Sequence, residues 1–321
     1  MSPPSTVVTV EKFYLNHAQT LQLKLVAGGA GLSRPIREGS INRPGLALAG
    51  FLRYFAYKRV QVIGGAEHQF LKSLTPSEAV ARIEAMLRRK IPCLVFARNL
   101  QPPAAVEEAC ERMQTPLFRT PMSTMKFINA ATIALEMDFA PTVSEQGSMV
   151  DILGIGVLIR GESGVGKSES VLALIERGYS LVSDDVTRIR LMEGRELIGT
   201  SAETTRYHME VRGLGIINVP AIFGVASVRT EKRLDLVVTL LDWHKMTDIE
   251  RTGLEQHTYN ILGIEVPHVT IPVRPGRDLA RLIEVAALDQ KLKSMGHNAA
   301  REFNERLIAR MRGASGLLPS T

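Results

Sequence analysis

The spacing of apolar residues predicts short strands mixed with helices in the first third of this chain. Apolar runs of strand length occur at residues 6–10, 22–26, 60–63 and 93–97. Apolar positions at helical spacing predict helices over 76–88, 104–113 and 126–139. The helix over 76–88 has a complete start signal, because Thr75 is a suitable N-cap, Pro76 fits the first helical position and Glu78 completes a T-x-x-E capping box.

The remainder of the chain follows an order of strand, loop, helix and strand. Strands are predicted at 154–159, 179–183, 236–241 and 266–273, and helices at 167–177, 279–294 and 298–312. This order is typical of an α/β nucleotide-binding core. Pro141 ends the helical pattern of 126–139. We therefore expect two α/β domains, 1–135 and 136–321, with a boundary within about ten residues of 135.

Composition favours a globular protein without a membrane segment. The 321 residues are 45% apolar and 22% charged, with a net charge of +6. The positive charge favours acidic partners, but no block of five like charges indicates a nucleic-acid arm. The longest uncharged stretch, 213–228, is too short and too interrupted to span a bilayer. With no signal peptide and only Cys93 and Cys110, which cannot form a disulfide framework, we expect a cytoplasmic protein.

One motif carries specific chemistry, a complete G-x-x-x-x-G-K-[ST] phosphate-binding loop. Its residues are Gly161, Glu162, Ser163, Gly164, Val165, Gly166, Lys167 and Ser168. The glycines allow the backbone N–H groups to approach phosphate, and the following helix presents its positive end. Lys167 would neutralise phosphate oxygens, and the Ser168 hydroxyl would hold Mg²⁺. A strand before the loop and a helix after it provide the context that the motif requires.

Two carboxylates, Asp184 and Asp185, follow the strand predicted at 179–183. Near a phosphate-binding loop, such groups can hold Mg²⁺ or accept a proton from an attacking hydroxyl. No N-K-x-D motif indicates a GTPase, and the seven histidines have no zinc-site spacing. The pair Trp243–His244 is expected to be structural.

A second motif resembles the signature of the HPr kinase/phosphorylase family. It comprises Met209, Glu210, Val211, Arg212, Gly213, Leu214, Gly215, Ile216, Ile217 and Asn218, and continues into Val219. Residues 41–50, 60–64, 91–98, 272–277, 284–287 and 293–296 are also similar to that family, so the resemblance covers nearly all of 5–312.

This resemblance implies an enzyme that phosphorylates a serine of HPr, a phosphocarrier protein, with ATP or pyrophosphate and Mg²⁺. It also implies phosphorolysis, in which inorganic phosphate removes the phosphoryl group and gives pyrophosphate. The implied fold is a regulatory or assembly domain resembling part of a Mur ligase, followed by a P-loop kinase domain related to phosphoenolpyruvate carboxykinase. The implied assembly is a hexamer.

The resemblance also assigns roles to individual residues. Asp185 would exchange the serine proton, Lys167 would bind phosphate, Arg251 would stabilise charge on the transferred group, and Ser168 and Glu210 would hold the metal. The signature would serve both reactions. A further loop would serve chiefly phosphorolysis, and its residues are Pro272, Val273, Arg274, Pro275, Gly276 and Arg277.

The sequence departs from the family pattern at Gln146, which occupies the position of a histidine. Glutamine can form hydrogen bonds, but it can neither carry a charge nor transfer a proton. We therefore expect kinase activity to survive and phosphorolysis to be weaker or differently regulated. Two alternatives remain open: a kinase of this fold with another substrate, or a nucleotide-gated regulatory protein without transfer.

Overall fold

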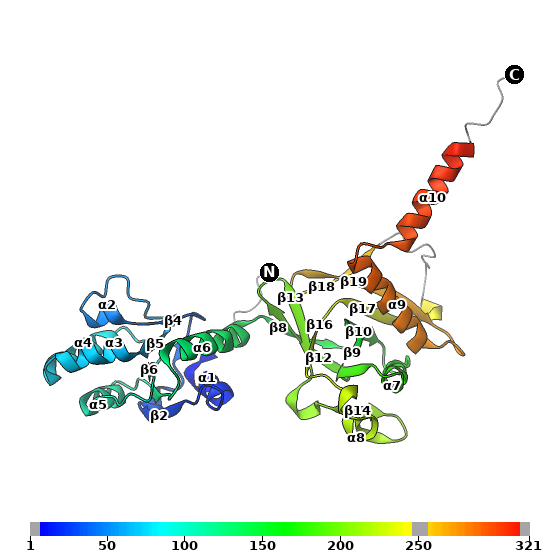
Figure 1. The fold of residues 1–321 in the computed structure, drawn as a ribbon. Helices are drawn as coiled ribbons and strands as arrows, with labels where there is room; N and C mark the ends of the chain where they lie inside the picture. Colours follow the sequence, from blue (N-terminus) through cyan, green and yellow to red (C-terminus); the bar gives the residue numbers. More distant parts are fainter. Residues whose placement is uncertain (1–6, 246–255, 315–321) are drawn as a thin grey trace. The chain divides into compact units, whose positions relative to one another are not determined.

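The computed structural model describes residues 7–245 and 256–314 and divides the chain into two compact units, Met1–Ala140 and Pro141–Thr321 (Figure 1). Helix α6 (Thr124–Phe139) ends directly before this division. Pro141 accounts for that position, because proline restricts the residue before it to extended conformations, which Ala140 adopts.

The first unit is built on a five-stranded sheet in the order β2-β7-β6-β5-β4. Its strands are β2 (Lys24–Ala27), β4 (Ile41–Asn42), β5 (Val60–Ile63), β6 (Leu94–Phe96) and β7 (Leu117–Arg119). Strands β4 to β7 are parallel, and β2 runs antiparallel to β7. A separate antiparallel pair joins β1 (Val8–Thr9) to β3 (Pro35–Ile36).

Helices cover both faces of this sheet, because successive strand residues point to opposite sides and both sides are apolar. Val95 packs in a cluster with α1 (Val10–His17) and α6, whereas Leu94 and Phe96 pack against the helices on the other face. Those helices are α2 (Gly45–Leu48), α3 (Gly65–Ser73), α4 (Pro76–Leu87) and α5 (Ala104–Arg112). The predicted capping box of α4 is present: Thr75 Oγ1 accepts from the Glu78 amide, and the Thr75 amide donates to Glu78 Oε2.

The strand predicted at residues 6–10 is only partly correct. Strand β1 ends at Thr9, whose side chain accepts a hydrogen bond from the Lys12 amide and so caps α1. Val10 and Phe13 of that helix are fully buried. A cap and an apolar helical face therefore outweigh the β-branched composition of the segment.

The second unit contains a six-stranded mixed sheet in the order β11-β9-β10-β17-β19-β18. Its strands are β9 (Ser148–Ile152), β10 (Ile155–Gly161), β11 (Ser180–Ser183), β17 (Leu236–Asp242), β18 (His257–Ile261) and β19 (Ile264–Val273). The three strands β10, β17 and β19 are parallel, and the others pair antiparallel.

A four-stranded antiparallel sheet, not predicted from the sequence, covers one face of the six-stranded sheet. Its order is β16-β13-β12-β8, with bounds β8 (Thr142–Gln146), β12 (Val186–Met192), β13 (Glu196–Thr200) and β16 (Glu231–Arg233). Leu158 of β10 and Ile189 of β12 belong to the core between the two sheets. Val157 and Ile159 point to the other face, where α7 (Lys167–Glu176) and α9 (Leu279–Ser294) complete the core.

The smaller elements of this unit lie near the ends of the strands or towards the C-terminus. They are the hairpin β14 (His208–Val211) and β15 (Gly215–Asn218), α8 (Val219–Phe223) and α10 (Ala299–Ala314). Four 3₁₀ turns occur in the whole described chain, at η1 (Gly29–Gly31), η2 (Glu203–Thr205), η3 (Val225–Ser227) and η4 (Trp243–Lys245). Among the described helices, none is both long and apolar enough to cross a membrane.

The chain passes from one sheet to the other at Gly147. Gln146 of β8 pairs with Val186 in the four-stranded sheet, whereas Ser148 of β9 pairs with Ile159 in the six-stranded sheet. Gly147 has φ +153°, and a Cβ atom there would lie 2.7 Å from the Ile159 carbonyl oxygen. Only glycine fits this corner without displacing the backbone.

Candidate active site

The predicted phosphate-binding loop connects β10 to α7, as its sequence context requires. Gly164 and Gly166 have φ values of +86° and +100°. These left-handed conformations strongly favour glycine. At Gly161, a Cβ atom would lie 2.6 Å from the Leu240 carbonyl oxygen. The glycines of the motif are thus explained both by backbone conformation and by close packing against β17.

The side chains of the loop are held by local contacts. Lys167 Nζ donates to the carbonyl oxygens of Gly161 and Glu162 at 2.7 and 2.9 Å. The Glu162 carboxylate pairs with Lys245 of η4 at 2.6 Å. Ser168 follows Lys167 in the first turn of α7 and is half-buried. The ammonium group of Lys167 therefore lies over the loop, where a phosphate group would bind.

The two carboxylates after β11 differ in their environments. Asp184 is half-buried: its Oδ1 accepts from Ser148 Oγ at 2.8 Å, and its Oδ2 accepts from the Glu210 amide at 3.1 Å. Burial raises the pKa of Asp184, and the charge of Asp185 acts in the same direction. The Asp185 side chain is exposed, and its backbone is left-handed, with φ +56°. Asp184 therefore organises the turn, and Asp185 presents its carboxylate to solvent.

The signature residues form the β14–β15 hairpin, which contacts the carboxylate turn and the phosphate-binding loop. The Glu210 amide bonds to Asp184, and Arg212 Nη2 donates to Ser163 Oγ at 3.3 Å. Met209 is buried in the main core, whereas the Glu210 side chain is exposed. The two sequence motifs, separated by about 40 residues, thus meet at one edge of the six-stranded sheet.

Gln146 lies beside the same turn. It is the last residue of β8, is exposed, and pairs with Val186, the residue after Asp185. The next amide, that of Gly147, donates to the Asp185 carbonyl oxygen at 2.7 Å. The residue that departs from the family pattern is therefore a neighbour of Asp185 across the sheet.

Comparison with known proteins identifies the family. The family model described as HPr Serine kinase C-terminal domain matches residues 137–307, and the one described as HPr Serine kinase N terminus matches 8–135. The chain belongs to the HPr kinase/phosphorylase family. Proteins named HPr kinase/phosphorylase are 44% identical in Geobacter sulfurreducens (91% of both chains) and 41% identical in Leptospira biflexa (95% of both). The prediction of a kinase/phosphorylase enzyme is confirmed.

One solved structure is similar in sequence to about half of this chain. The HPr(Ser) kinase/phosphatase of Coxiella burnetii is 36% identical and covers 51% of this chain and 99% of its own, with a TM-score of 0.46. A relative named HPr kinase/phosphorylase in Geobacillus kaustophilus is 43% identical over 90% of this chain and 93% of its own. The two α/β units of the fold match the two family models.

The loop at 272–277 extends from the end of β19 at the same edge of the sheet as the phosphate-binding loop. The Arg274 guanidinium lies over the indole ring of Trp243 in η4, and Arg277 Nη1 donates to the Pro272 carbonyl oxygen at 3.3 Å. The Trp243 side chain is thus packed against a residue of the loop 272–277. Arg251 lies outside the residues that the structure describes.

The oxygen ligands near the loop suit a hard cation bound with phosphate. Within residues 7–245 and 256–314, no three His, Cys, Asp or Glu side chains are close enough to form a complete metal site. Mg²⁺ usually takes one or two protein oxygens and completes its shell with phosphates and water. The hydroxyl of Ser168 and the carboxylate of Glu210 are groups of this type, so the residues present fit a nucleotide-associated Mg²⁺.

Sequence reasoning did not identify Ser148 or the separate role of Asp184. Ser148 is fully buried, and its hydroxyl bonds to a residue 36 positions away. No local motif marks such a contact. A serine beside the apolar pair Met149–Val150 is the one sequence signal that could have drawn attention to it.

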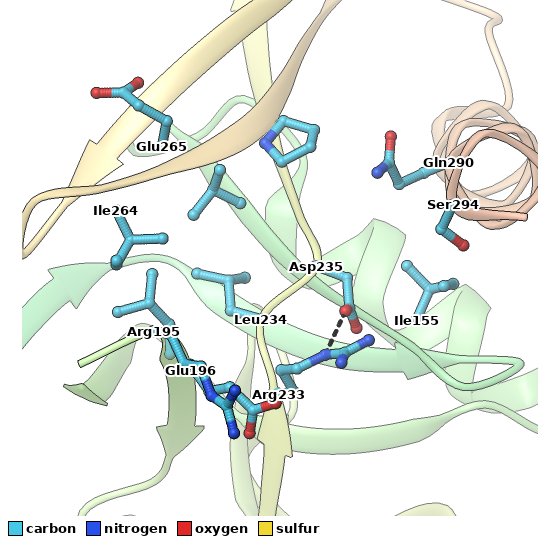
Figure 2. Close-up of a pocket in the computed structure, with 13 residues that line it drawn as sticks. Ile155, Arg195, Glu196, Arg233, Leu234, Asp235, Ile264, Glu265, Gln290 and Ser294 are labelled. Carbon is cyan, nitrogen blue, oxygen red and sulfur yellow. Dashed lines mark hydrogen bonds and ion pairs between the residues drawn. The ribbon is translucent and has the colours of Figure 1, made fainter. Parts of the chain in front are cut away.

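A cavity of about 520 Å³ lies away from these residues (Figure 2). Its lining includes Arg233, Asp235, Glu265 and Gln290, and Arg233 Nε donates to Asp235 Oδ1 at 2.7 Å. Ile155 and Ile264, which begin β10 and β19, also line it. Because the phosphate-binding loop follows the end of β10, this cavity lies at the opposite end of the parallel strands and is not part of the nucleotide site.

Proposed function

We propose that the chain transfers a phosphoryl group from ATP or pyrophosphate to a serine of HPr, and that it removes this group by phosphorolysis. The observation that supports the proposal is the bridge made by Asp184. Its carboxylate bonds to Ser148 beside the phosphate-binding strand and to the Glu210 amide of the signature hairpin. The contact between Arg212 and Ser163 joins the same hairpin to the phosphate-binding loop.

In the forward direction, the loop amides and Lys167 hold the phosphoryl donor. The hydroxyl oxygen of the substrate serine forms a bond to the phosphorus, and Asp185 accepts the proton that this hydroxyl loses. The bond from phosphorus to the bridging oxygen breaks, and ADP or phosphate leaves. Arg251 would stabilise the negative charge on the transferred group. Ser168 and Glu210 would hold Mg²⁺, which neutralises phosphate charge when it is bound.

In the reverse direction, an oxygen of inorganic phosphate attacks the phosphoserine phosphorus, and the products are pyrophosphate and serine. The departing serine oxygen takes back the proton carried by Asp185. Arg274 and Arg277 of the loop 272–277 would bind the incoming phosphate as cationic donors. Gln146 can orient a group near Asp185 by hydrogen bonding, but it cannot deliver a proton. We therefore expect phosphorolysis to be the slower reaction.

Exposed apolar residues beside the site support a protein as the acceptor. Leu214 and Ile216 on the signature hairpin are each 76% exposed, and Ile222 and Val225 on the adjoining segment are 59% and 86% exposed. Apolar side chains grouped on a surface are typical of protein-binding sites. A small-molecule acceptor would not require them.

The remaining family properties belong to the same proposal. We expect a homohexamer in the cytoplasm, with no nucleic-acid or membrane partner. We also expect the first unit to resemble part of a Mur ligase, and the second to be related to phosphoenolpyruvate carboxykinase. Light scattering of the purified chain tests the hexamer, and superposition on solved members of those two fold families tests the relationships.

The decisive experiment is a transfer assay with purified protein, Mg²⁺ and γ-labelled ATP. Wild-type HPr should become labelled, and HPr with its target serine changed to alanine should not. Excess inorganic phosphate should then release the label slowly as pyrophosphate. Label that is never released would remove the phosphorolysis part of the proposal. Nucleotide binding without any labelling of HPr would contradict the proposed substrate and favour another acceptor or a regulatory role.

A further inference from the structure

A group of three side chains crosses the inside of the corner at Gly147. Glu145 precedes the corner on β8, Arg160 lies on β10, and Tyr259 lies on β18. Arg160 Nη2 lies 3.4 Å from Glu145 Oε2, and Tyr259 Oη donates to the same oxygen at 3.3 Å. The Arg160 guanidinium stacks over the Tyr259 ring, with its Cζ atom 4.3 Å from the ring centroid. We call these three residues the corner cluster.

The corner cluster joins the two sheets from within. Leu158 and Val143, two residues before Arg160 and Glu145 respectively, pack in the core between the sheets. Strand alternation directs Arg160 and Glu145 into the same space. The side chain of Arg160 is 26% exposed, and that of Glu145 is 16% exposed. Arg160 Cγ would also lie 3.1 Å from a Cβ atom at Gly147, so the arginine packs directly against the corner.

Stability alone is a weak explanation for this arrangement. The Nε atom of Arg160 is buried without a hydrogen-bond partner. Largely buried ion pairs are often no more stabilising than well-packed apolar residues. What the cluster does provide is a direct polar link from β8 in one sheet to β10 and β18 in the other.

The strands that it joins carry the two halves of the site. Gly161, the first residue of the phosphate-binding loop, follows Arg160 directly. Glu145 precedes Gln146 and Gly147, and the Gly147 amide holds the Asp185 carbonyl oxygen. A change in the bend at Gly147 would therefore move Asp185 relative to the loop.

We propose that Glu145, Arg160 and Tyr259 are positioning residues that fix this bend and thereby set the distance between Asp185 and the phosphate held by the loop. The expected effect on the rate of phosphoryl transfer rests on the proposed function. Misplacing a reacting group by about 1 Å can lower a rate by about 10²-fold. The donor-binding loop itself keeps its own contacts, which do not involve the cluster.

The first test is a set of kinetic measurements on Arg160→Met and Glu145→Gln. Each variant should lower kcat by about 10- to 100-fold and leave the KM for ATP within about two-fold. The double variant should lose no more than the stronger single variant, because the two residues act as one unit. Arg160→Lys should recover part of the lost kcat. The matched control is Arg195→Met, which breaks an exposed ion pair with Glu193 in the same unit and should leave kcat unchanged. Unchanged kcat in Arg160→Met, or losses that multiply in the double variant, would overturn the proposal.

The second test does not depend on the substrate. Spin labels on cysteines introduced at Ser144 of β8 and Glu176 of α7, both exposed positions, report the geometry across the corner. The native Cys93 and Cys110 are fully buried, and burial raises the pKa of both thiols, so they should not be labelled. Arg160→Met should shift or broaden the measured distance distribution, and Arg195→Met should not. A distance distribution that is unchanged in Arg160→Met would reject the positioning role, whether or not the wild-type enzyme phosphorylates HPr. A wild-type enzyme that is inactive on HPr would instead refute the proposed function and leave the distance measurement valid.

Discussion

Replacing Ser148 with alanine should destabilise the second unit in a pH-dependent manner. The serine hydroxyl is fully buried and donates to Asp184 Oδ1 at 2.8 Å. Its Oγ atom also accepts a long hydrogen bond from the Asp185 amide at 3.4 Å. A hydrogen bond to a charged group contributes about 1.5–3 kcal/mol, against about 0.5–1.5 kcal/mol for a neutral pair. We therefore expect Ser148→Ala to lower the free energy of unfolding by about 1.5–3 kcal/mol where Asp184 is ionised.

The pH dependence follows from the direction of the Asp184 pKa shift. Burial raises this pKa in the folded protein, and the Ser148 hydrogen bond partly opposes the rise. In wild type, the contribution of Asp184 to stability is therefore present below its unfolded pKa and is lost as the pH rises through its folded pKa. The variant lacks the bond that favours the ionised form, so its folded pKa is higher still. The difference between wild type and variant should be largest at neutral pH and should shrink as the pH falls through the folded pKa.

Urea unfolding followed by tryptophan fluorescence can measure this difference. Trp243 is the only tryptophan and lies in the second unit, so its emission follows the unfolding of that unit. Ser227→Ala is the matched control, because Ser227 is also buried and its hydroxyl donates to the neutral Gly224 carbonyl oxygen. The control should lose about 0.5–1.5 kcal/mol at every pH. The reasoning would be refuted if Ser148→Ala showed the same loss as the control and no dependence on pH.

Three further predictions concern the chemistry of the site. Asp185→Asn should lower the rate of transfer by about 10²–10⁴-fold, because the exposed carboxylate would act on the serine proton. The Kd for ATP, measured by equilibrium binding, should stay unchanged, because the carboxylate would not contact the nucleotide. Gln146→His should raise the rate of phosphorolysis more than the rate of phosphorylation. If neither rate differs between the variant and the wild type, the role given to this position is contradicted. Arg274→Met should uncover the Trp243 indole and shift its emission to longer wavelength, whereas Arg277→Met, which removes a contact to a backbone oxygen, should not.

The parts of the structure that could be predicted from sequence depend on local signals. The helix α4 begins where its capping box indicates, because Thr75 and Glu78 are three residues apart and satisfy each other's amides. The phosphate-binding loop is equally local, since its glycines, lysine and serine are contiguous. A contiguous motif between a strand and a helix specifies both the backbone conformation and the chemistry.

The four-stranded sheet could not be predicted in the same way. Paired residues of β8 and β12 are 40 to 48 positions apart in the sequence, and those of β13 and β16 are 31 to 35 positions apart. Strand β12 mixes charged and apolar residues, because one face covers the core while the other lies in solvent. Only the pairing of distant segments gives these short amphipathic runs their structure, and a single sequence does not contain that information.

The same limit explains why local sequence patterns did not separate Asp184 from Asp185, so that only the family resemblance selected Asp185. A raised carboxyl pKa is often taken to mark a general base, and that rule alone would select Asp184. However, both oxygens of Asp184 are directed at structural donors, the Ser148 hydroxyl and the Glu210 amide. A general base must reach the proton that it abstracts, so geometry takes precedence over pKa. Asp185 is exposed on a left-handed backbone that the Gly147 amide supports, and for this reason the proposed mechanism assigns it the serine proton. Asp184 has the perturbed pKa because it is buried at the turn that it organises, and the proposed mechanism gives the proton transfer to the exposed Asp185.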